Sequence, residues 1–338
     1  MNKDKNIAEM LRLIKQITNK IPARHLQHIF WSPKTSSDAG KVDGFILYAY
    51  GGYILKIFIK EERLVYKTNY HNYKNNYFGD LWDEKFEKNN CGVCKSSVNI
   101  DTLMGITSLW ENILEAYRRR MYGEGAIDNK YFERGRATSI ARNLEMNSNL
   151  EDFYFIEQES RIKASKKKPD LIGIRKNKES MILSFIEYKC TTGGMDGVTL
   201  TEHFEDMCNF YQNVDINAGY KTLYEQMQEF AEFKYCQLEK GFKVDYIGGG
   251  EIVFLFSHIG VENGITAQKI YNDVCRLIYN CKEYSKYKEN VKFLVLKDEN
   301  ELYKTENYVD AETLLKHKIF ENCDKDEWKN ERRKANIM

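Results

Sequence analysis

The chain has 338 residues, enough for one large domain or two ordinary ones, and 42% of them are hydrophobic, which suffices for a packed core. No apolar run approaches the roughly 18 residues that cross a membrane, and the charged segment Met1–Met10 lacks the apolar core of a secretion signal, so we expect a cytoplasmic protein with no membrane partner. The net charge of +1 gives no global basic field and weighs against a passive protein that coats DNA, although it permits an enzyme with one basic face.

The N-terminal part of the chain reads as a helix followed by a small sheet. Apolar residues at helical spacing predict a helix over residues 6–20. Alternation over 44–68, broken at Gly51-Gly52 and Glu61-Glu62, predicts two or three strands. Residues 69–100 lack a clear period and are expected to be irregular. We therefore assign residues 1–100 to an α+β module for target recognition or assembly.

The middle of the chain has a more regular order of elements. We predict helices over 101–120 and 131–146, strands over 152–163, 170–175 and 181–189, helices over 202–213 and 220–240, and a buried strand over 251–256. A helix near 266–282, a strand near 291–297 and a charged helical tail over 311–336 follow. This pattern indicates an α/β core over 101–265 and a C-terminal α/β extension over 266–338 that packs on it.

The eight cysteines do not form a disulfide framework. Cys91 and Cys94 have zinc-knuckle spacing, but no second Cys or His pair lies nearby. Two free thiols in a loop are therefore favoured over half of a zinc site that a dimer would complete. The other six are scattered through apolar stretches and are expected to be reduced structural thiols: Cys190, Cys208, Cys236, Cys275, Cys281 and Cys323.

Two carboxylates and a lysine gather on the hairpin formed by the strands over 170–175 and 181–189. A turn symmetric about Lys178 and Glu179 places Asp170 opposite Glu187, with Cβ atoms about 4.5–5.5 Å apart. Strand alternation puts Lys189 on the same face as Glu187. An exposed Glu–Lys pair is the plain alternative, but the strand that ends in this motif is apolar on both faces.

Paired carboxylates of this kind favour a divalent metal site. Two adjacent carboxylates repel one another unless a cation bridges them. Mg²⁺ (or Mn²⁺) prefers oxygen ligands and keeps bound waters available for chemistry. Such an ion polarises a phosphodiester and activates water, while the Lys189 ammonium offsets charge that grows on the phosphoryl oxygens. The three side chains thus supply the parts for phosphodiester hydrolysis.

The motif Pro169-Asp170, a strand, and then Glu187-Tyr188-Lys189 resembles the signature of the PD-(D/E)XK nuclease superfamily. The order of elements over about 130–260 is similar to the αβββαβ core of its restriction-endonuclease-like fold, a mixed sheet flanked by helices. The resemblance implies that Asp170, Glu187 and the backbone carbonyl of Tyr188 hold the metal. It also implies that Lys189 positions or activates water.

Many members of that superfamily add a glutamate from the preceding helix. Glu133 is our candidate for this catalytic position, because it shares a predicted helical face with Ala137 and Ile140 and a buried carboxylate needs a partner. Its place near a helix N-terminus, where anions are favoured, explains Glu133 equally well. Glu157 and Glu159, on the intervening strand, are further options.

Positively charged residues flank the motif in sequence. Gln226 belongs to a segment that resembles the Gln-x-x-x-Tyr element of the exonuclease-like branch, although Phe230 replaces Tyr and a core-facing helix explains the segment better. A solvated surface is the ordinary explanation for the lysine and arginine residues near the motif, but their clustering predicts a rim that binds the nucleic-acid backbone. The candidate nucleic-acid-binding residues are Lys166, Lys167, Lys168, Arg134, Arg136 and Gln226.

These features predict a Mg²⁺-dependent endonuclease that hydrolyses DNA and serves restriction or phage defence. The expected partner is nucleic acid, with DNA favoured over RNA, and a homodimer is left open. A non-catalytic nucleic-acid-binding or assembly protein that kept the fold, an RNase, and a repair exonuclease are the alternatives. The choice of DNA and of defence rests on the family resemblance rather than on the site.

Overall fold

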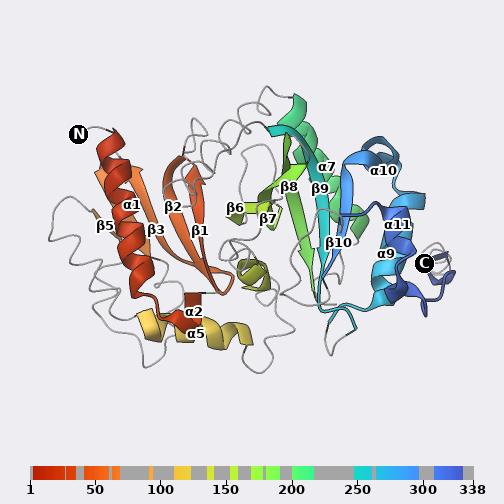
Figure 1. Cartoon of the computed structure of the whole chain (residues 1–338), viewed down its shortest axis with the longest axis horizontal. Coiled ribbons are helices and arrows are strands. Elements are labelled where there is room, and N and C mark those ends of the chain that lie inside the picture. The colour runs from red at the N-terminus through yellow and green to blue at the C-terminus, as the bar shows by residue number, and fades with distance from the viewer. Residues whose placement is uncertain are drawn as a thin grey trace, which may run out of the picture. The chain divides into compact units, whose positions relative to one another are not determined.

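The computed structural model describes residues 3–26, 28–35, 42–60, 63–68, 91–93, 110–122, 135–140, 153–158, 169–177, 180–190, 200–216, 247–260, 264–296 and 308–329. The chain divides into two compact units, one of residues 1–146 with 225–243 and one of residues 147–224 with 244–338. Each unit is built on its own five-stranded sheet (Figure 1). The predicted boundaries at residues 100 and 265 do not coincide with this division.

The first unit contains an antiparallel sheet whose strands follow one another in chain order. The strands are β1 (Ile29–Thr35), β2 (Val42–Ala49), β3 (Gly52–Lys60), β4 (Arg63–Thr68) and β5 (Cys91–Val93). The predicted strands over 44–68 are therefore confirmed as β2, β3 and β4. We did not predict β1, an edge strand that contains Pro33, or the short β5, which falls in the stretch expected to be irregular.

The described helical segments of the first unit are α1, α2, α5 and residues 135–140. Helix α1 (Lys3–Lys20) confirms the predicted helix over 6–20, and its apolar stripe, which includes Met10, Leu13 and Ile17, is buried. A short α2 (Ala23–Leu26) follows. Helix α5 (Trp110–Tyr122) confirms the predicted helix over 101–120 in its described part. Of the helix predicted over 131–146, residues 135–140 are described and are helical.

A histidine pair fixes the tight turn between β2 and β3. Tyr50 and Gly51 both have positive φ, 49° and 80°, as a two-residue hairpin turn of type I′ requires. The buried His25 ring bonds the Tyr50 hydroxyl at 2.6 Å. The His28 ring stacks on the Tyr50 ring with centroids 4.6 Å apart, and burial lowers the pKa of His28 to about 4. This cluster therefore holds a non-glycine residue in the left-handed region.

The second unit contains a mixed sheet in the order β10-β9-β8-β7-β6. Its strands are β6 (Phe153–Gln158), β7 (Leu171–Asn177), β8 (Ser180–Lys189), β9 (Ile247–Phe256) and β10 (Val291–Val295). The first three pair antiparallel, whereas β8 with β9 and β9 with β10 pair parallel. All five strands were predicted at nearly these positions, so the mixed α/β class is confirmed. Strand β10 lies beyond residue 265 and yet extends the same sheet.

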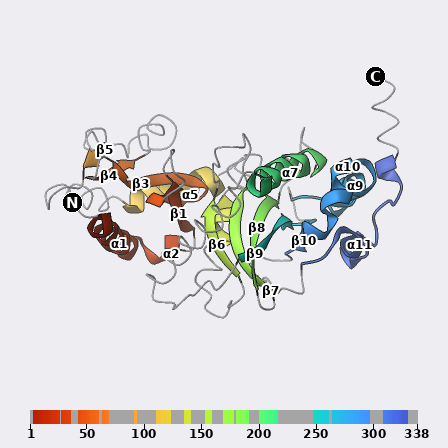
Figure 2. The same ribbon diagram turned by 90° about the horizontal axis from the view of Figure 1, so that it is seen from above.

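Helices α7 (Leu200–Ile216), α9 (Ala267–Asn280) and α10 (Lys282–Tyr287) pack on one another beside this sheet (Figure 2). Phe204 joins helix to sheet, with its ring centroid 6.4 Å from that of Phe254 on β9 and 6.0 Å from that of Tyr284 on α10. Helix α9 begins where the Thr266 hydroxyl accepts a hydrogen bond from the Lys269 backbone N–H. The helix predicted over 220–240 lies outside the described residues.

The helical tail predicted over 311–336 is confirmed only in part. Of the described residues 311–329, α11 (Ala311–Leu315), the 3₁₀ turn η8 (Lys318–Phe320) and residues 327–329 are helical, and turns separate these segments. The His317 ring accepts a hydrogen bond from the Ile319 N–H, and Asp324 accepts one from the Asp326 N–H. These side chains satisfy backbone donors locally and so interrupt the helix. Among the described residues, no helix combines the length and the apolar character needed to cross a membrane.

Replacing Phe204 by Ala is expected to destabilise the second unit. The Phe204 side chain is fully buried, and truncating such a residue typically costs about 3–5 kcal/mol. Urea unfolding of the full chain measures the loss. Glu205→Ala, an exposed change one position along the same helix, is the control and should stay within about 0.5 kcal/mol of wild type. Equal losses for the two variants would contradict the packing described here.

Candidate active site

The hairpin of β7 and β8 has the register that the turn predicts. Leu171 pairs with Ile186, Ile172 with Phe185 and Asn177 with Ser180. One step beyond the first pair lie Asp170 and Glu187, which the sequence places opposite each other. The predicted register is confirmed. It brings Asp170 to the strand end that carries Glu187, Tyr188 and Lys189.

A backbone hydrogen bond fixes Asp170 at this strand end. The N–H of Tyr188 donates to Asp170 Oδ2 at 2.9 Å. Pro169, immediately before Asp170, is buried and has no N–H to offer the ladder, so β7 begins only at Leu171. The Asp170 carboxylate thus continues the pairing that the backbone of β7 would otherwise make. Its position is set by the sheet rather than by a loop.

Glu187 is a buried carboxylate that contacts two basic side chains. Glu187 and Lys189 have exposed fractions of only 5% and 3%. Lys189 Nζ lies 2.9 Å from Glu187 Oε1, which confirms that both side chains share one face of β8. His203 Nδ1, from α7, lies 2.9 Å from the same oxygen. Both contacts fall on Oε1, which leaves Oε2 as the oxygen that could face a cation.

The charge of Glu187 is maintained against its burial. Burial by itself raises the pKa of Glu187, but the Lys189 ammonium and the hydrogen bond from His203 outweigh that effect and lower the pKa to about 2. Removing an ion pair from water costs several kcal/mol per ion. The attraction between the ions offsets this cost only if the geometry is good and further hydrogen bonds help. His203 supplies such a bond. The carboxylate therefore stays ionised at neutral pH.

Sequence reasoning did not find His203. It comes from a helix whose rotation relative to the sheet depends on tertiary packing. The available signal was a histidine next to the buried positions among the described side chains of α7, which are Leu200, Phe204, Met207 and Cys208. The spacing of these residues predicts a helix that packs on the sheet. It does not tell which strand residue the histidine meets.

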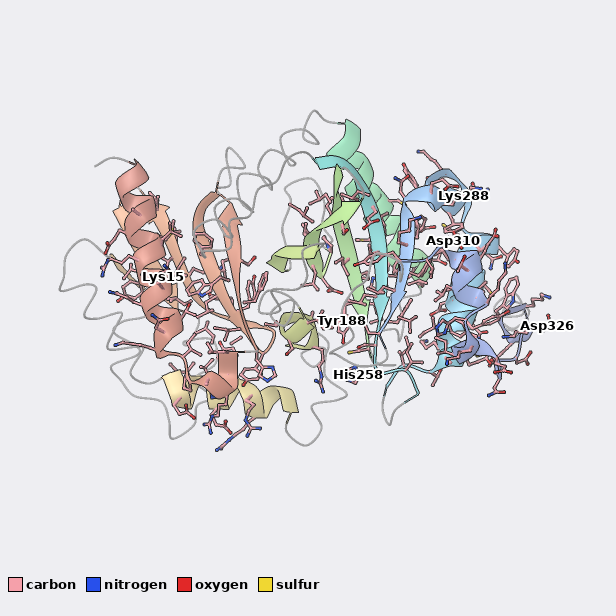
Figure 3. All side chains as sticks on the ribbon, in the orientation of Figure 1. Lys15, Tyr188, His258, Lys288, Asp310 and Asp326 are labelled. Atoms are coloured by element: carbon pink, nitrogen blue, oxygen red, sulfur yellow. The ribbon has the colours of Figure 1, made fainter. Side chains whose placement is uncertain are left out.

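The opposite face of β8 carries a separate hydrogen-bonded chain. The Tyr188 hydroxyl bonds Ser257 Oγ at 2.6 Å, and Ser257 Oγ bonds His258 Nδ1 at 2.8 Å. The Ser257 N–H also donates to the Lys189 carbonyl at 3.1 Å. Figure 3 labels Tyr188 and His258. These bonds tie the end of β8 to the segment that follows β9, and so hold the strand end from its second edge.

The remaining predicted site residues are placed only in part. Arg136 lies in the first unit, on the helical residues 135–140, and is half-buried. Glu157 lies in β6, where it pairs with Ile172. The following predicted residues lie outside the described part of the chain: Glu133, Arg134, Glu159, Lys166, Lys167, Lys168 and Gln226.

The described cysteines agree with the expectation of reduced thiols. Cys190, Cys208, Cys275 and Cys281 are buried free thiols, and Cys323 is a free thiol of intermediate exposure. Burial raises the pKa of Cys208, which disfavours its reactive thiolate form. Cys91 begins β5, whereas Cys94 and Cys236 lie outside the described residues. The zinc question for Cys91 and Cys94 stays a prediction.

The donor atoms at the end of β8 fit a hard cation. Over the described residues, no three His, Cys, Asp or Glu side chains form a group that could hold a metal ion. Mg²⁺, however, commonly uses one or two carboxylates and keeps several waters. The Tyr188 N–H points at Asp170, and in an antiparallel ladder the carbonyl of the same residue points to the same side. Asp170, Glu187 Oε2 and the Tyr188 carbonyl could therefore bind one ion.

Comparison with known proteins adds no relative to this picture. A scan against protein-family models finds no match, and searches of curated proteins and of solved structures find no significant match either. The arrangement of the site therefore has to carry the functional argument.

Replacing Glu187 by Gln is expected to destabilise the fold strongly at neutral pH and less in acid. The pKa of Glu187 is lowered from 4.5 to about 2, so its charged contacts stabilise the protein fully above pH 4.5 and are lost as the pH falls toward about 2. Removing one member of a buried ion pair typically costs about 3–5 kcal/mol. Urea unfolding of wild type and of Glu187→Gln, near neutral pH and in acid, measures the difference between their free energies of unfolding. This difference should become smaller as the pH falls.

The control for this comparison is Glu205→Gln, which changes an exposed carboxylate on α7. Its free energy of unfolding should stay within about 0.5 kcal/mol of wild type near neutral pH. A difference between wild type and Glu187→Gln that is the same at every pH would show that the charge of Glu187 does not stabilise the fold.

Proposed function

We propose that this protein is a metal-dependent nuclease that hydrolyses phosphodiester bonds. The observation that carries the proposal is the buried Glu187–Lys189 pair at the end of β8, with Asp170 held at the same strand end by the Tyr188 N–H. Acidic and basic groups converge there on a place where a phosphodiester and a cation could meet. Buried charges with a perturbed pKa are typical of functional sites.

A purely structural role explains this arrangement less well. A buried ion pair contributes little to stability, and apolar residues of similar volume often serve a core equally well. The rest of β8 shows this, since Leu183, Phe185 and Ile186 are almost fully buried. The charged residues are confined to the strand end next to Asp170. This confinement favours a site that is kept for chemistry.

The order of strands supports the family proposal. Three antiparallel strands, β6, β7 and β8, are followed by β9, which is parallel to β8. Helix α7 lies between β8 and β9 in the chain and packs on Phe254 of β9 through Phe204. We propose that this is the core of a restriction-endonuclease-like fold of the PD-(D/E)XK superfamily, to which the motif Pro169-Asp170 and Glu187-Tyr188-Lys189 also points.

In this proposal Asp170, Glu187 and the Tyr188 carbonyl would hold Mg²⁺ or Mn²⁺. When bound, such an ion polarises the phosphodiester and lowers the pKa of a bound water. Lys189 places its ammonium beside the reacting phosphoryl group and offsets the negative charge that grows on its oxygens. Glu187 keeps Lys189 in place, because their contact of 2.9 Å is buried. The Tyr188 N–H keeps the Asp170 carboxylate at the strand end.

The substrate proposal is DNA, cut internally in the manner of restriction or phage-defence endonucleases. It rests on the resemblance of the motif, because either DNA or RNA fits the chemistry at the strand end. Glu133, and a rim that includes Lys166, Lys167 and Lys168, remain proposals for a further catalytic carboxylate and for backbone contacts.

Cleavage assays on a substrate panel test the function. The panel is supercoiled plasmid, linear duplex, single-stranded DNA and RNA, each with Mg²⁺, Mn²⁺ or EDTA. We expect nicking of closed circular DNA that EDTA abolishes. Lys189→Ala should lower the rate about 100- to 1,000-fold, as is typical when a group that stabilises transition-state charge is removed. Lys282→Ala, an exposed change on α10, is the matched control and should cleave like wild type.

The outcomes separate the alternatives. Cleavage that survives EDTA or Lys189→Ala would overturn the metal-site proposal. Digestion of linear DNA while closed circles survive would favour an exonuclease, and cleavage of RNA alone would favour an RNase. A wild-type protein that binds Mn²⁺ and cuts none of the four substrates would favour a non-catalytic nucleic-acid-binding role.

A further inference from the structure

The first unit holds two histidines at the turn between β2 and β3, and neither takes part in the proposed chemistry. Both contact Tyr50, whose backbone is in the left-handed region with a φ of 49°. The His25 ring lies edge-on to the Tyr50 ring, with centroids 5.9 Å apart, and the His28 ring stacks on it at 4.6 Å. The Tyr50 N–H also donates to the His28 carbonyl at 3.0 Å. Two titratable rings thus hold one residue of the turn.

The contacts of His25 require its ring to be neutral. The side chain is fully buried. Arg24 Nε donates a hydrogen bond to His25 Nε2 at 3.2 Å, and because a guanidinium can only donate, Nε2 carries no proton. The proton of the neutral ring is therefore on Nδ1, which donates to the Tyr50 hydroxyl at 2.6 Å. A second proton, on Nε2, would face the Arg24 N–H and break that bond.

Charged groups from α2 and α5 face His25. Arg24 also pairs with Glu111 of α5, and Glu111 Oε1 lies 3.7 Å from His25 Nε2. Glu115 and Arg118, further along α5, form an ion pair at 2.6 Å. Burial, followed by the charge of Arg24, lowers the pKa of His25 below its ordinary 6.5. Glu115 opposes this shift and Arg118 adds to it.

His28 links the same turn to the helical residues 135–140. Its Nδ1 bonds Ser139 Oγ at 2.7 Å, and the Ser139 hydroxyl donates to the Gly135 carbonyl at 3.0 Å. The single hydroxyl proton of Ser139 is used in that second bond, so His28 Nδ1 is the donor in the first. The two histidines and the ring between them therefore connect segments that lie far apart in the sequence.

A positive charge on either ring is unfavourable while this cluster is intact. Burial lowers the pKa of His28 to about 4, and the charges of Arg136, His25 and Arg118 act in the same direction. Because both rings contact Tyr50, a charge on one histidine repels a charge on the other. In the unfolded chain each histidine has a pKa of about 6.5. The cluster therefore stabilises the fold fully above pH 6.5, and this contribution is lost as the pH falls toward about 4.

Helix α5 packs on the residues that follow this turn. The Tyr117 hydroxyl donates to the Tyr53 carbonyl at 3.1 Å. The Tyr117 ring lies so close to Gly52 that a Cβ there would be 2.6 Å from it. This fit depends on the path of the chain through Tyr50 and Gly51, which both have positive φ. A turn that left this conformation would lose its contact with α5.

We propose that His25 and His28 form an acid-sensitive latch of the first unit. While both rings are neutral, they hold Tyr50 in its left-handed conformation and join the turn to α2, α5 and residues 135–140. When the rings take up protons, the bond between Arg24 and His25 is lost, the two charges repel each other, and the turn releases these segments. The sheet of the first unit then opens in mild acid. This inference does not depend on the proposed nuclease function.

Hydrogen exchange of backbone amides tests the latch in the full chain. Exchange measured by mass spectrometry between about pH 7 and pH 4, and corrected for the intrinsic effect of pH on exchange, gives the opening equilibrium of β2 and β3. We expect the opening constant to rise up to about tenfold per pH unit for each histidine below pH 6.5. Strand β9 of the second unit should stay protected, because Glu187 keeps its charged contacts down to a pH of about 2.

Asparagine variants remove the titration and keep the donor. In His25→Asn and His28→Asn the side-chain NH₂ can occupy the place of Nδ1, and an amide takes up no proton in this pH range. In the double variant the opening of β2 and β3 should depend little on pH. His317→Asn, which changes a half-buried histidine of the second unit, is the control and should behave like wild type. The same pH dependence in the double variant as in wild type would overturn the latch.

NMR titration of wild type keeps the test decisive if the double variant does not fold. Ring chemical shifts of His25 and His28, assigned with the single variants, report when each ring takes up a proton. We expect both rings to do so only below pH 6.5, together with the loss of protection in β2 and β3. Rings that titrate near pH 6.5 while these strands stay protected would overturn the latch. Simultaneous loss of protection in β3 and β9 would also contradict it, because the first unit would then have no opening of its own.

Discussion

A buried carboxylate can remain charged only if the fold supplies enough partners, and this constraint organises the second unit around Glu187. Lys189 comes from the same strand and His203 from α7, so helix and sheet must meet at one place. Phe204, the next residue of α7, anchors that meeting between β9 and α10. Phe204 therefore packs α7 against its apolar neighbours, and His203, the residue before it, contacts the charge of Glu187.

The end of β8 is held on both of its edges. On one edge the Tyr188 N–H reaches the Asp170 carboxylate, and on the other the Lys189 carbonyl accepts from the Ser257 N–H. A strand end usually frays, but here neighbouring segments fix successive residues of the motif. Catalytic geometry tolerates errors of only about half an ångström, so such fixing is what a site for phosphodiester hydrolysis requires.

Those parts of the fold and of the site that depend on short-range periodicity could be predicted from the sequence. The register of β7 and β8 follows from a short turn and a period of two, which is why the placement of Asp170 and Glu187 could be derived before the fold was known. His203 could not be found in this way, because contacts between a helix and its neighbours depend on rotation and docking. Local side-chain bonds, such as the one that His317 makes, interrupted a tail whose composition favours helix. Strand β1 was not predicted, because it contains Pro33 and proline is rare in strands.

The core of the proposed site draws on one hairpin, and this has a consequence for how such a protein can change. Asp170, Glu187 and Lys189 inherit their rigidity from the centre of a five-stranded sheet. Loops and surface segments can therefore accumulate substitutions, insertions and new target preferences without moving the reactive groups. In the proposed nuclease, chemistry and target choice would be separable traits. A lineage could keep the hairpin and exchange nearly everything that decides what is recognised.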